Sequence, residues 1–376
     1  MFSGTFFLLV LTVFVMVYRM NSSFAPLTFL RSESSYSSHS ISRGNDSWTL
    51  GELRGTTVSI NECSNNDRLA MLRRGCKTNP EARMTMPHGL DGLTFRDALY
   101  NLTDNQLRQV VRNILSDEEH RVLYCAIPKT GCTSWKTIFL QNSHRFLKNG
   151  TVGKVYSVHT PKYLKGFGIV PLSQYSRNDI YFRLDNYYSV IAVRHPLDRL
   201  ISGYNDKLVK KNKSYQNNVG KYILRTFRNE PVNDSSAAGV GVTFTEFLKY
   251  INKEKGKHPF IDPHWENYYK SCFPCLIRYD FIAKLETSTS DMNFVANHVL
   301  SKEMVETSFN NQRGGGYNFQ SGSQVLQKYS EVPERLFYDV LQYYSADMEI
   351  FGYSAWRDVT EGRIRARCGQ AEGGCC

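Results

Sequence analysis

Two short strand-like runs, each followed at once by a helical pattern, constrain the fold of this chain most strongly. The first run, Arg121–Ile127 (RVLYCAI), is ended by Pro128, and a helical pattern continues over Ser134–Leu147. The second run, Tyr188–Val193 (YSVIAV), precedes a helical pattern over Leu197–Leu208. Alternation of strand and helix is typical of an α/β fold. We therefore predict a parallel sheet flanked by helices, the first of which turns inward Trp135, Ile138, Phe139 and Phe146.

The loop between the first strand and its helix has the sequence PKTGCTSWK. A glycine-containing loop that enters a helix directs backbone N–H groups and the positive end of the helix dipole toward one point, which suits a phosphate or sulfate. Lys129 adds a full positive charge. The alternative is an ordinary turn in which Lys129 is solvated. The candidate anion-binding residues are Pro128, Lys129, Thr130, Gly131, Cys132, Thr133 and Ser134.

This loop is not a Walker A motif, because that motif ends in Gly-Lys-Ser/Thr whereas Lys129 precedes the glycine. A phosphotransferase that uses ATP also needs an acidic residue to hold its metal ion, and we can assign none. The pattern therefore favours a metal-free phosphosulfate over ATP, and no metal is expected.

The segment after the second strand, RHPLDRLISGYNDK, begins at Arg194. Arg194 and Ser202 lie two helical turns apart and can face the same phosphate, which arginine can bind in a bidentate manner. Asp198 and Arg199 are ambiguous, because a helix-start charge and an ion pair explain them as well as ligand contact does. The candidate residues are Arg194, His195, Pro196, Leu197, Asp198, Arg199, Leu200, Ile201 and Ser202.

The amino terminus contains an uncharged run, Phe2–Tyr18, near the lower limit of length for crossing a bilayer. A cleaved signal peptide is the alternative, but its basic start is missing. We predict a cytoplasmic end and membrane anchor over residues 1–18, a poorly structured lumenal stem over 19–92 and a catalytic domain over 93–358. A tail, 359–376, follows. Regular structure is expected to begin near Leu93, with a helical pattern that continues to Leu115.

Several features agree with a secretory compartment. The nine cysteines permit disulfides there, with pairing that the sequence does not define. N-glycosylation sequons begin at Asn21, Asn45, Asn101, Asn149, Asn212 and Asn233. The formal net charge of +11 favours polyanionic partners, among them nucleic acid, acidic glycans and phosphorylated cofactors.

Other residues admit two interpretations. His264, in DPHWENYY, is the candidate general base because imidazole titrates near neutrality, but a structural or glycan-binding histidine is the alternative. Cys272 and Cys275 supply only two of four metal ligands, so a disulfide is favoured, to each other or elsewhere. Lys211–Gly241 is expected to be a surface excursion, followed by a helix near Phe244–Ile251. The aromatic residues near the carboxyl end are expected to form the core face of a final helix.

Together the two loop segments resemble the 5′-phosphosulfate and 3′-phosphate motifs of sulfotransferases that use 3′-phosphoadenosine-5′-phosphosulfate (PAPS). The chain is most similar to the Golgi carbohydrate sulfotransferases of the HNK-1 and chondroitin/dermatan 4-O group. This resemblance extends from about Leu115 to Tyr353 and includes HW, CFPC, YDFIAKLE and MEIFGY. Thr130 and Ser134 depart from the Val and Asn of many relatives, and the tail RIRARCGQAEGGCC has no counterpart.

The resemblance implies a P-loop-like sulfotransferase fold and a type II protein of the Golgi membrane with a lumenal catalytic domain. PAPS is then the sulfuryl donor, and the acceptor is a glycan, with position 4 of GalNAc in chondroitin, dermatan or an N-glycan expected. No nucleic-acid partner is expected. Lys129 is the residue that neutralises the leaving group, and His264 is the base. The alternatives are a catalytically silent lumenal glycan-binding protein and a nucleotide-dependent kinase.

Overall fold

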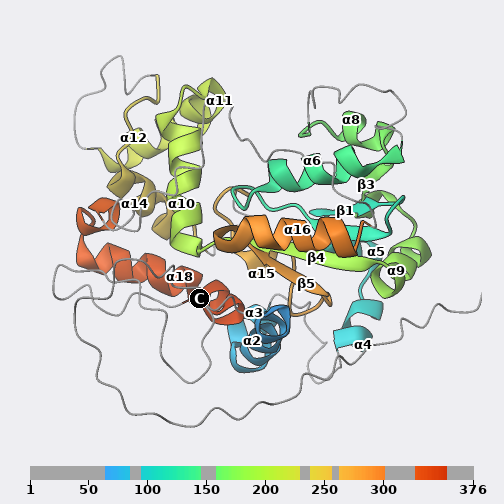
Figure 1. The fold of residues 1–376 in the computed structure, drawn as a ribbon. Coiled ribbons are helices and arrows are strands. Elements are labelled where there is room, and N and C mark those ends of the chain that lie inside the picture. The colour runs from blue at the N-terminus through green and yellow to red at the C-terminus, as the bar shows by residue number, and fades with distance from the viewer. Residues whose placement is uncertain are drawn as a thin grey trace, which may run out of the picture. The chain divides into compact units, whose positions relative to one another are not determined.

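A five-stranded sheet lies at the centre of the computed structural model, in the order β3-β1-β2-β4-β5 (Figure 1). The model describes residues 64–84, 95–144, 158–228, 238–255, 262–300 and 327–353. The strands are β1 (Ile114–Asp117), β2 (Val122–Cys125), β3 (Ile169–Pro171), β4 (Tyr188–Val193) and β5 (Phe281–Lys284). β2, β4 and β5 are parallel, whereas β1 is antiparallel to both of its neighbours. The predicted sheet is thus parallel only in part.

Helices cover both faces of this sheet. They are α2 (Asn65–Thr78), α3 (Pro80–Met84), α4 (Phe95–Tyr100), α5 (Asp104–Val110), α6 (Cys132–Asn142), α8 (Pro161–Gly166), α9 (Arg177–Asn186), α10 (Pro196–Tyr204), α11 (Lys213–Tyr215), α12 (Lys221–Phe227), α14 (Phe244–Glu254), α15 (Tyr268–Ser271), α16 (Ser288–His298) and α18 (Glu334–Phe351). Short 3₁₀ turns η1 (Leu172–Gln174) and η4 (Leu285–Thr287), and π turns η2 (Asn205–Val209) and η3 (Gln216–Gly220), complete the described elements.

The two faces of the sheet belong to separate hydrophobic clusters, because successive side chains of a strand point to opposite faces. Tyr124 and Val190 pack with α6, α8 and α16 on one face. Cys125 and Ile191 pack with α2, α5, α10, α14 and α18 on the other. Figure 1 shows α6 and α16 together on one side of the sheet, with α2 and α18 on the other. The result is a three-layer α/β/α arrangement, as predicted from the alternation of strands and helices.

The edge strand β5 is covered by helix α2. The amide of Asn65 donates to Asp280 O at 2.8 Å, and its oxygen accepts from Ile282 N at 3.0 Å. The guanidinium of Arg68 donates to Ile282 O at 2.8 Å and forms an ion pair with Asp291, also at 2.8 Å. These side chains satisfy backbone groups that an edge strand otherwise exposes.

The prediction that regular structure begins near Leu93 is therefore wrong. A disulfide between Cys76 and Cys275 also joins α2 to the rest of the domain. The residues of α2 are mostly polar, so its sequence resembles a linker, and its position depends on contacts with residues more than 200 positions away.

Three further expectations change in detail. Ile114 and Leu115 belong to β1 rather than to a helix, and the helix predicted to reach Leu208 becomes a π turn after Tyr204. The described part of the surface excursion Lys211–Gly241 contains α11, η3 and α12. The prediction that the CFPC cysteines form disulfides is confirmed, and of the two alternatives they pair elsewhere, Cys272 with Cys125 and Cys275 with Cys76.

Other expectations are confirmed. Trp135, Ile138 and Phe139 are buried on α6, and α14 covers the helix predicted near Phe244–Ile251. α18 buries Phe337, Tyr344 and Phe351, although Tyr338 is exposed.

Three predicted features fall outside the described residues. Phe146 and the apolar run Phe2–Tyr18 both lie there, as does the tail 359–376. Among the helices that the model describes, none has the length and apolar character required to cross a membrane.

Candidate active site

The candidate site lies where β2, β4 and β5 end. These strands are parallel and adjacent, so their carboxyl ends meet at one edge of the sheet. The loop before α6 leaves β2 there, the Arg194 turn leaves β4, and Glu286 follows β5. Ligands of open α/β sheets commonly bind at such an edge. The topology therefore brings the two predicted anion-binding segments together.

The first loop has a strained backbone at Lys129. Lys129 has φ 72°, in the left-handed region that non-glycine residues rarely adopt, and Gly131 has φ 83°. Gly131 is the N-cap of α6, and no side chain caps this helix. The first backbone N–H groups of α6 are thus not satisfied by a capping side chain, which is the arrangement of a helix N-terminus that binds an anion.

Lys129 faces the end of α10. Its Nζ lies 3.4 Å from Oδ2 of Asp206, which also pairs with Lys207 at 3.2 Å. Burial and the nearby Lys207 and Lys210 lower the pKa of Lys129, while Asp206 acts in the opposite direction. Burial raises the pKa of Asp206, but Lys129 and Lys207 outweigh that effect and the net pKa is lowered. The single carboxylate of Asp206 thus offsets the positive charges of both Lys129 and Lys207.

The other residues of the first loop differ in their exposure and in their hydrogen bonds. The hydroxyl of buried Thr130 donates to Ile127 O at 2.9 Å, so it shapes the loop. Thr133 is exposed, and its Oγ1 lies 3.1 Å from Nε2 of His159. Cys132 has a free, half-exposed thiol, and Ser134 is also half-exposed.

The second segment presents one face of α10 toward the same edge. Arg194, Asp198, Ser202 and Asp206 recur every four residues and are all half-buried. Nε of Arg194 is buried without a hydrogen-bond partner among the described residues. Burial raises the pKa of Asp198 to about 6, with Arg194 acting against this rise and Glu286 adding to it. An anion beside Arg194 can satisfy its unpaired donor.

Other members of the second segment point away from this face. Pro196, Leu197, Leu200 and Ile201 are buried. His195 caps α10, because its Nδ1 accepts from Leu197 N at 3.3 Å, and its ring packs against Tyr353. Its backbone N–H donates to Glu286 at 2.8 Å.

Arg199 is buried and is bound by backbone carbonyls. Its side chain is 1% exposed. Its Nε donates to Pro128 O at 3.1 Å, and its two terminal nitrogens donate to Glu266 O at 2.6 Å and Pro263 O at 2.7 Å. The guanidinium also lies over the ring of Tyr268, 4.7 Å from its centroid. Arg199 therefore connects the Lys129 loop with the segment that carries His264.

His264 is held by a carboxylate and a phenol. Its Nδ1 lies 2.7 Å from Oδ1 of Asp262 and 3.1 Å from the hydroxyl of Tyr215. Tyr215 donates to the other oxygen of Asp262 at 2.7 Å. Nζ of Lys207 lies 5.0 Å from the centroid of the Tyr215 ring, so this cluster adjoins the Asp206 pair beside Lys129.

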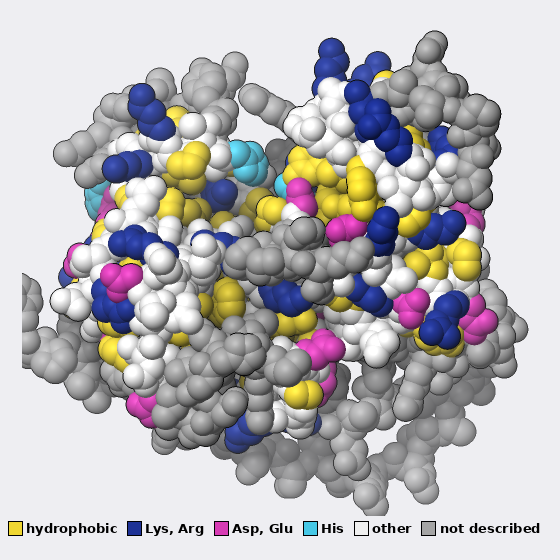
Figure 2. Space-filling model, turned by 180° about the vertical axis from the view of Figure 1, so that it is seen from behind, with side chains coloured by type: hydrophobic (Ala, Val, Ile, Leu, Met, Phe, Trp, Pro, Cys, Tyr) yellow, Lys and Arg dark blue, Asp and Glu magenta, His cyan; other side chains and the backbone are white. Residues whose placement is uncertain are grey.

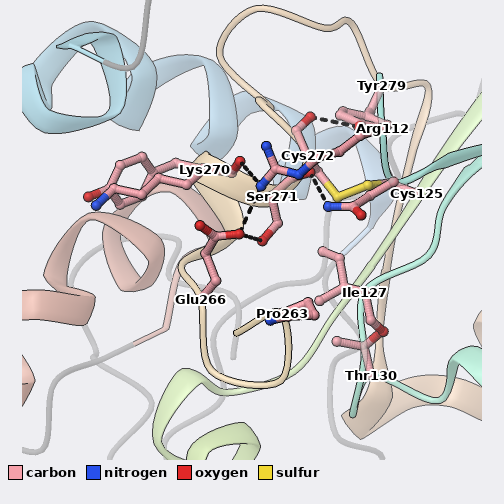
Figure 3. Close-up of a disulfide and its surroundings, with 12 residues drawn as sticks. Arg112, Cys125, Ile127, Thr130, Pro263, Glu266, Lys270, Ser271, Cys272 and Tyr279 are labelled. Carbon is pink, nitrogen blue, oxygen red and sulfur yellow. Dashed lines mark hydrogen bonds and ion pairs between the residues drawn. A yellow bond between two sulfur atoms is a disulfide. The ribbon is translucent and has the colours of Figure 1, made fainter. Parts of the chain in front are cut away.

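A disulfide fixes the segment that carries His264 to the central sheet. Cys125 ends β2, and its bond to Cys272 joins that strand to the segment after His264 (Figure 3). Beside it, Arg112 donates to Oε2 of Glu266 at 2.9 Å and to Lys270 O at 3.2 Å. The covalent link and these contacts fix the position of the His264 segment relative to the first loop.

Sequence reasoning missed five residues of this neighbourhood. They are His159, Asp206, Lys207, Tyr215 and Asp262. Asp206 continues the four-residue spacing from Arg194, and Asp262 lies two residues before His264, so both had a local signal. Tyr215 and His159 had none, because only the fold brings them near the site.

Basic side chains are spread over the face of the described residues shown in Figure 2. Figure 2 shows Lys and Arg side chains across the described face, mixed with fewer Asp and Glu. Around the site, burial lowers the pKa of His159, and the adjacent Lys136 and Lys207 lower it further. The environment of the site is thus positive.

Comparison with known proteins agrees with this geometry. Residues 112–354 match the model of the sulfotransferase family. Carbohydrate sulfotransferase 9 of Homo sapiens is 31% identical over 66% of this chain and 55% of its own length. Carbohydrate sulfotransferase 14 of Danio rerio is 30% identical over 70% of this chain and 68% of its own length, and the mouse protein of that name is 32% identical over 68% and 63%.

No solved structure matched the chain significantly. The matched region contains both predicted anion-binding segments, Arg199 and His264, so the sequence relationship covers the whole candidate site. This chain belongs to the sulfotransferase family.

Proposed function

We propose that this chain is a carbohydrate O-sulfotransferase, which transfers a sulfuryl group from PAPS to a hydroxyl of a glycan. One observation carries the proposal: two anion-binding features lie on neighbouring parallel strands at one edge of the sheet. They are the uncapped start of α6 with Lys129, and Arg194 with its unpartnered Nε. A nucleotide with a phosphosulfate at one end and a phosphate at the other fits both. The names of the curated relatives support the choice of a carbohydrate acceptor.

PAPS supplies the sulfuryl group when bound: its bond from sulfur to a phosphate oxygen breaks, and the electron pair leaves with adenosine 3′,5′-bisphosphate. Lys129 and the first amides of α6 neutralise charge on that leaving oxygen. Arg194 and Ser202 hold the 3′-phosphate. His264 accepts the proton of the acceptor hydroxyl, whose oxygen forms the new bond to sulfur.

The acceptor that we propose is position 4 of GalNAc, in chondroitin, dermatan or an N-glycan. Uronate-bearing chains suit the positive surroundings of the site, where Lys136, Lys207 and Lys210 adjoin His159 and Lys129. We also propose that the protein is a single-pass type II protein of the Golgi membrane with its catalytic domain in the lumen.

The test is transfer of labelled sulfate from PAPS by the purified full-length chain. The acceptors are desulfated chondroitin, dermatan and heparan, and GalNAc-terminated N-glycans. We expect transfer to chondroitin, dermatan or the N-glycan. Lys129→Ala should abolish it, because the leaving oxygen loses its cation, while Lys162→Ala at an exposed position of α8 should leave it intact.

Two outcomes contradict the proposal. Magnesium-dependent transfer of phosphate from ATP identifies a kinase. Glycan binding with no transfer from PAPS to any acceptor identifies a catalytically silent glycan-binding protein. Transfer that persists in Lys129→Ala refutes the role of that lysine.

A further inference from the structure

The hydrogen bonds around His264 define which ring nitrogen carries a proton. Asp262 Oδ1 lies 2.7 Å from Nδ1, and an ionised carboxylate can approach a ring nitrogen this closely only if the nitrogen donates a proton. Tyr215 cannot donate to Nδ1 at the same time, because its hydroxyl donates to Oδ2 of Asp262 at 2.7 Å. In the neutral imidazole, Nδ1 is thus the protonated nitrogen, and Nε2 carries the free electron pair.

The carboxylate of Asp262 is itself held on both oxygens. Oδ1 also accepts the backbone N–H of His264 at 2.9 Å, and Oδ2 accepts from Tyr215. Burial acts to raise the pKa of Asp262, but hydrogen bonds from His264 and Tyr215 outweigh it, so the pKa is lowered and the group stays ionised. Burial and Asp262 raise the pKa of Tyr215, which keeps its hydroxyl a donor.

Tyr215 comes from a different part of the chain, α11, whose N-cap is Asn212. Oδ1 of Asn212 accepts from Tyr215 N at 3.3 Å. The ring of Tyr215 packs edge-on against His264 and Trp265, with centroid distances of 5.6 Å and 6.0 Å. Arg199 fixes the same segment at Pro263 O and Glu266 O. The imidazole is therefore held in one orientation by groups from three elements.

We infer that Asp262 is a positioning residue for sulfuryl transfer, which fixes the tautomer of His264 so that Nε2 accepts the proton of the acceptor hydroxyl, and that Tyr215 orients Asp262. This inference rests on the proposed function, because it assigns a role in the same reaction. The proton moves from the acceptor hydroxyl to Nε2 as the new oxygen–sulfur bond forms, and Nδ1–H stays with its hydrogen bond to Asp262. The resulting imidazolium is stabilised by that carboxylate.

The experiment compares Asp262→Asn, Asp262→Glu and Tyr215→Phe with His264→Ala in the full-length chain. Asp262→Asn keeps the shape but can offer an N–H toward Nδ1, which favours the wrong tautomer. We expect it to lower kcat by about 10²–10⁴-fold, as expected for loss of general base catalysis. Affinity for adenosine 3′,5′-bisphosphate should be unchanged. Asp262→Glu should have a higher kcat than Asp262→Asn, and Tyr215→Phe should lower kcat by roughly tenfold or less. Asp104→Asn, at an exposed carboxylate, is the matched control.

The results separate the two proposals. If the unaltered chain transfers no sulfate from PAPS, the proposed function fails. If it transfers sulfate but Asp262→Asn or His264→Ala retains kcat within about threefold, the inference fails and the sulfotransferase function stands. Equal losses of kcat and of bisphosphate affinity in Asp262→Asn also overturn the inference, because they indicate a structural role.

Discussion

Replacing Arg199 by lysine tests whether this residue binds the donor or joins two loops. Lysine keeps the positive charge but cannot reproduce the planar guanidinium that donates to Pro128, Pro263 and Glu266 carbonyls. At least one of these carbonyls is then left without its partner. Each unsatisfied buried acceptor costs about 1–3 kcal/mol, which corresponds to a fall in Tm of roughly 2–12 °C for a domain of this size.

The kinetic effect follows from the same contacts. Pro128 adjoins Lys129, which is proposed to act on the leaving group, and Pro263 adjoins His264, which is proposed to act on the acceptor. Loss of a hydrogen bond from residue 199 to either carbonyl therefore allows the distance between Lys129 and His264 to vary. A displacement of about 1 Å can lower a rate by about 10²-fold. We therefore expect Arg199→Lys to reduce kcat by one to two orders of magnitude, with affinity for adenosine 3′,5′-bisphosphate changed by about threefold or less.

Three measurements on the full-length chain decide the question: Tm, kcat for sulfate transfer, and calorimetric affinity for the bisphosphate. Arg278→Lys is the control, because the side chain of Arg278 is 90% exposed. A large loss of bisphosphate affinity with an unchanged Tm refutes the reasoning. That result places Arg199 in contact with the nucleotide, as one interpretation of the sequence allowed.

Two further predictions concern the support of the site. Serine replacement of both Cys76 and Cys275 should lower the free energy of unfolding by about 2–5 kcal/mol with little change in kcat. The same replacement of Cys125 and Cys272 should lower both the free energy of unfolding and kcat, because this second bond joins β2 to the His264 segment. Denaturant unfolding and transfer assays measure the two effects, and equal changes of kcat in the two variants would contradict the prediction. Burial raises the pKa of Asp347 from 3.8 to about 7, so its stabilising contribution is present below pH 4 and is lost as the pH rises through 7. Asp347→Asn should therefore flatten the dependence of Tm on pH between 5 and 8, and an unchanged slope would count against this assignment.

The strand-loop-helix units could be predicted because their signals are local. Tyr188–Val193 is a continuous apolar run, and β4 has the bounds that were predicted for it. The glycine in the first loop marks a turn into a helix, although β2 ends at Cys125, two residues before the predicted end of the first strand. β1 was missed because Ile114 and Leu115 also fit the helical spacing of the preceding apolar residues. A strand of four residues offers too short a pattern to decide between the two periods.

The remaining errors share a physical cause, which is that the stabilising contacts are remote in sequence. α2 is held by the backbone of β5 and by a disulfide across 199 residues, and no local pattern encodes either contact. The burial of Arg199 was not predicted because arginine is rarely buried, yet three carbonyls and the ring of Tyr268 compensate its burial.

α10 has two roles because its residues divide between two faces. Every fourth residue from Arg194 to Asp206 lies on the half-buried face, where Asp206 pairs with Lys129. Arg199 lies on the buried face and connects the Lys129 loop with the His264 segment. Because Arg199 lies in α10 and Asp206 lies in η2, which directly follows it, a rotation of α10 must move the contacts of the Lys129 loop and of the His264 segment together. Variants on its buried face should therefore change the rate of transfer without contacting either substrate.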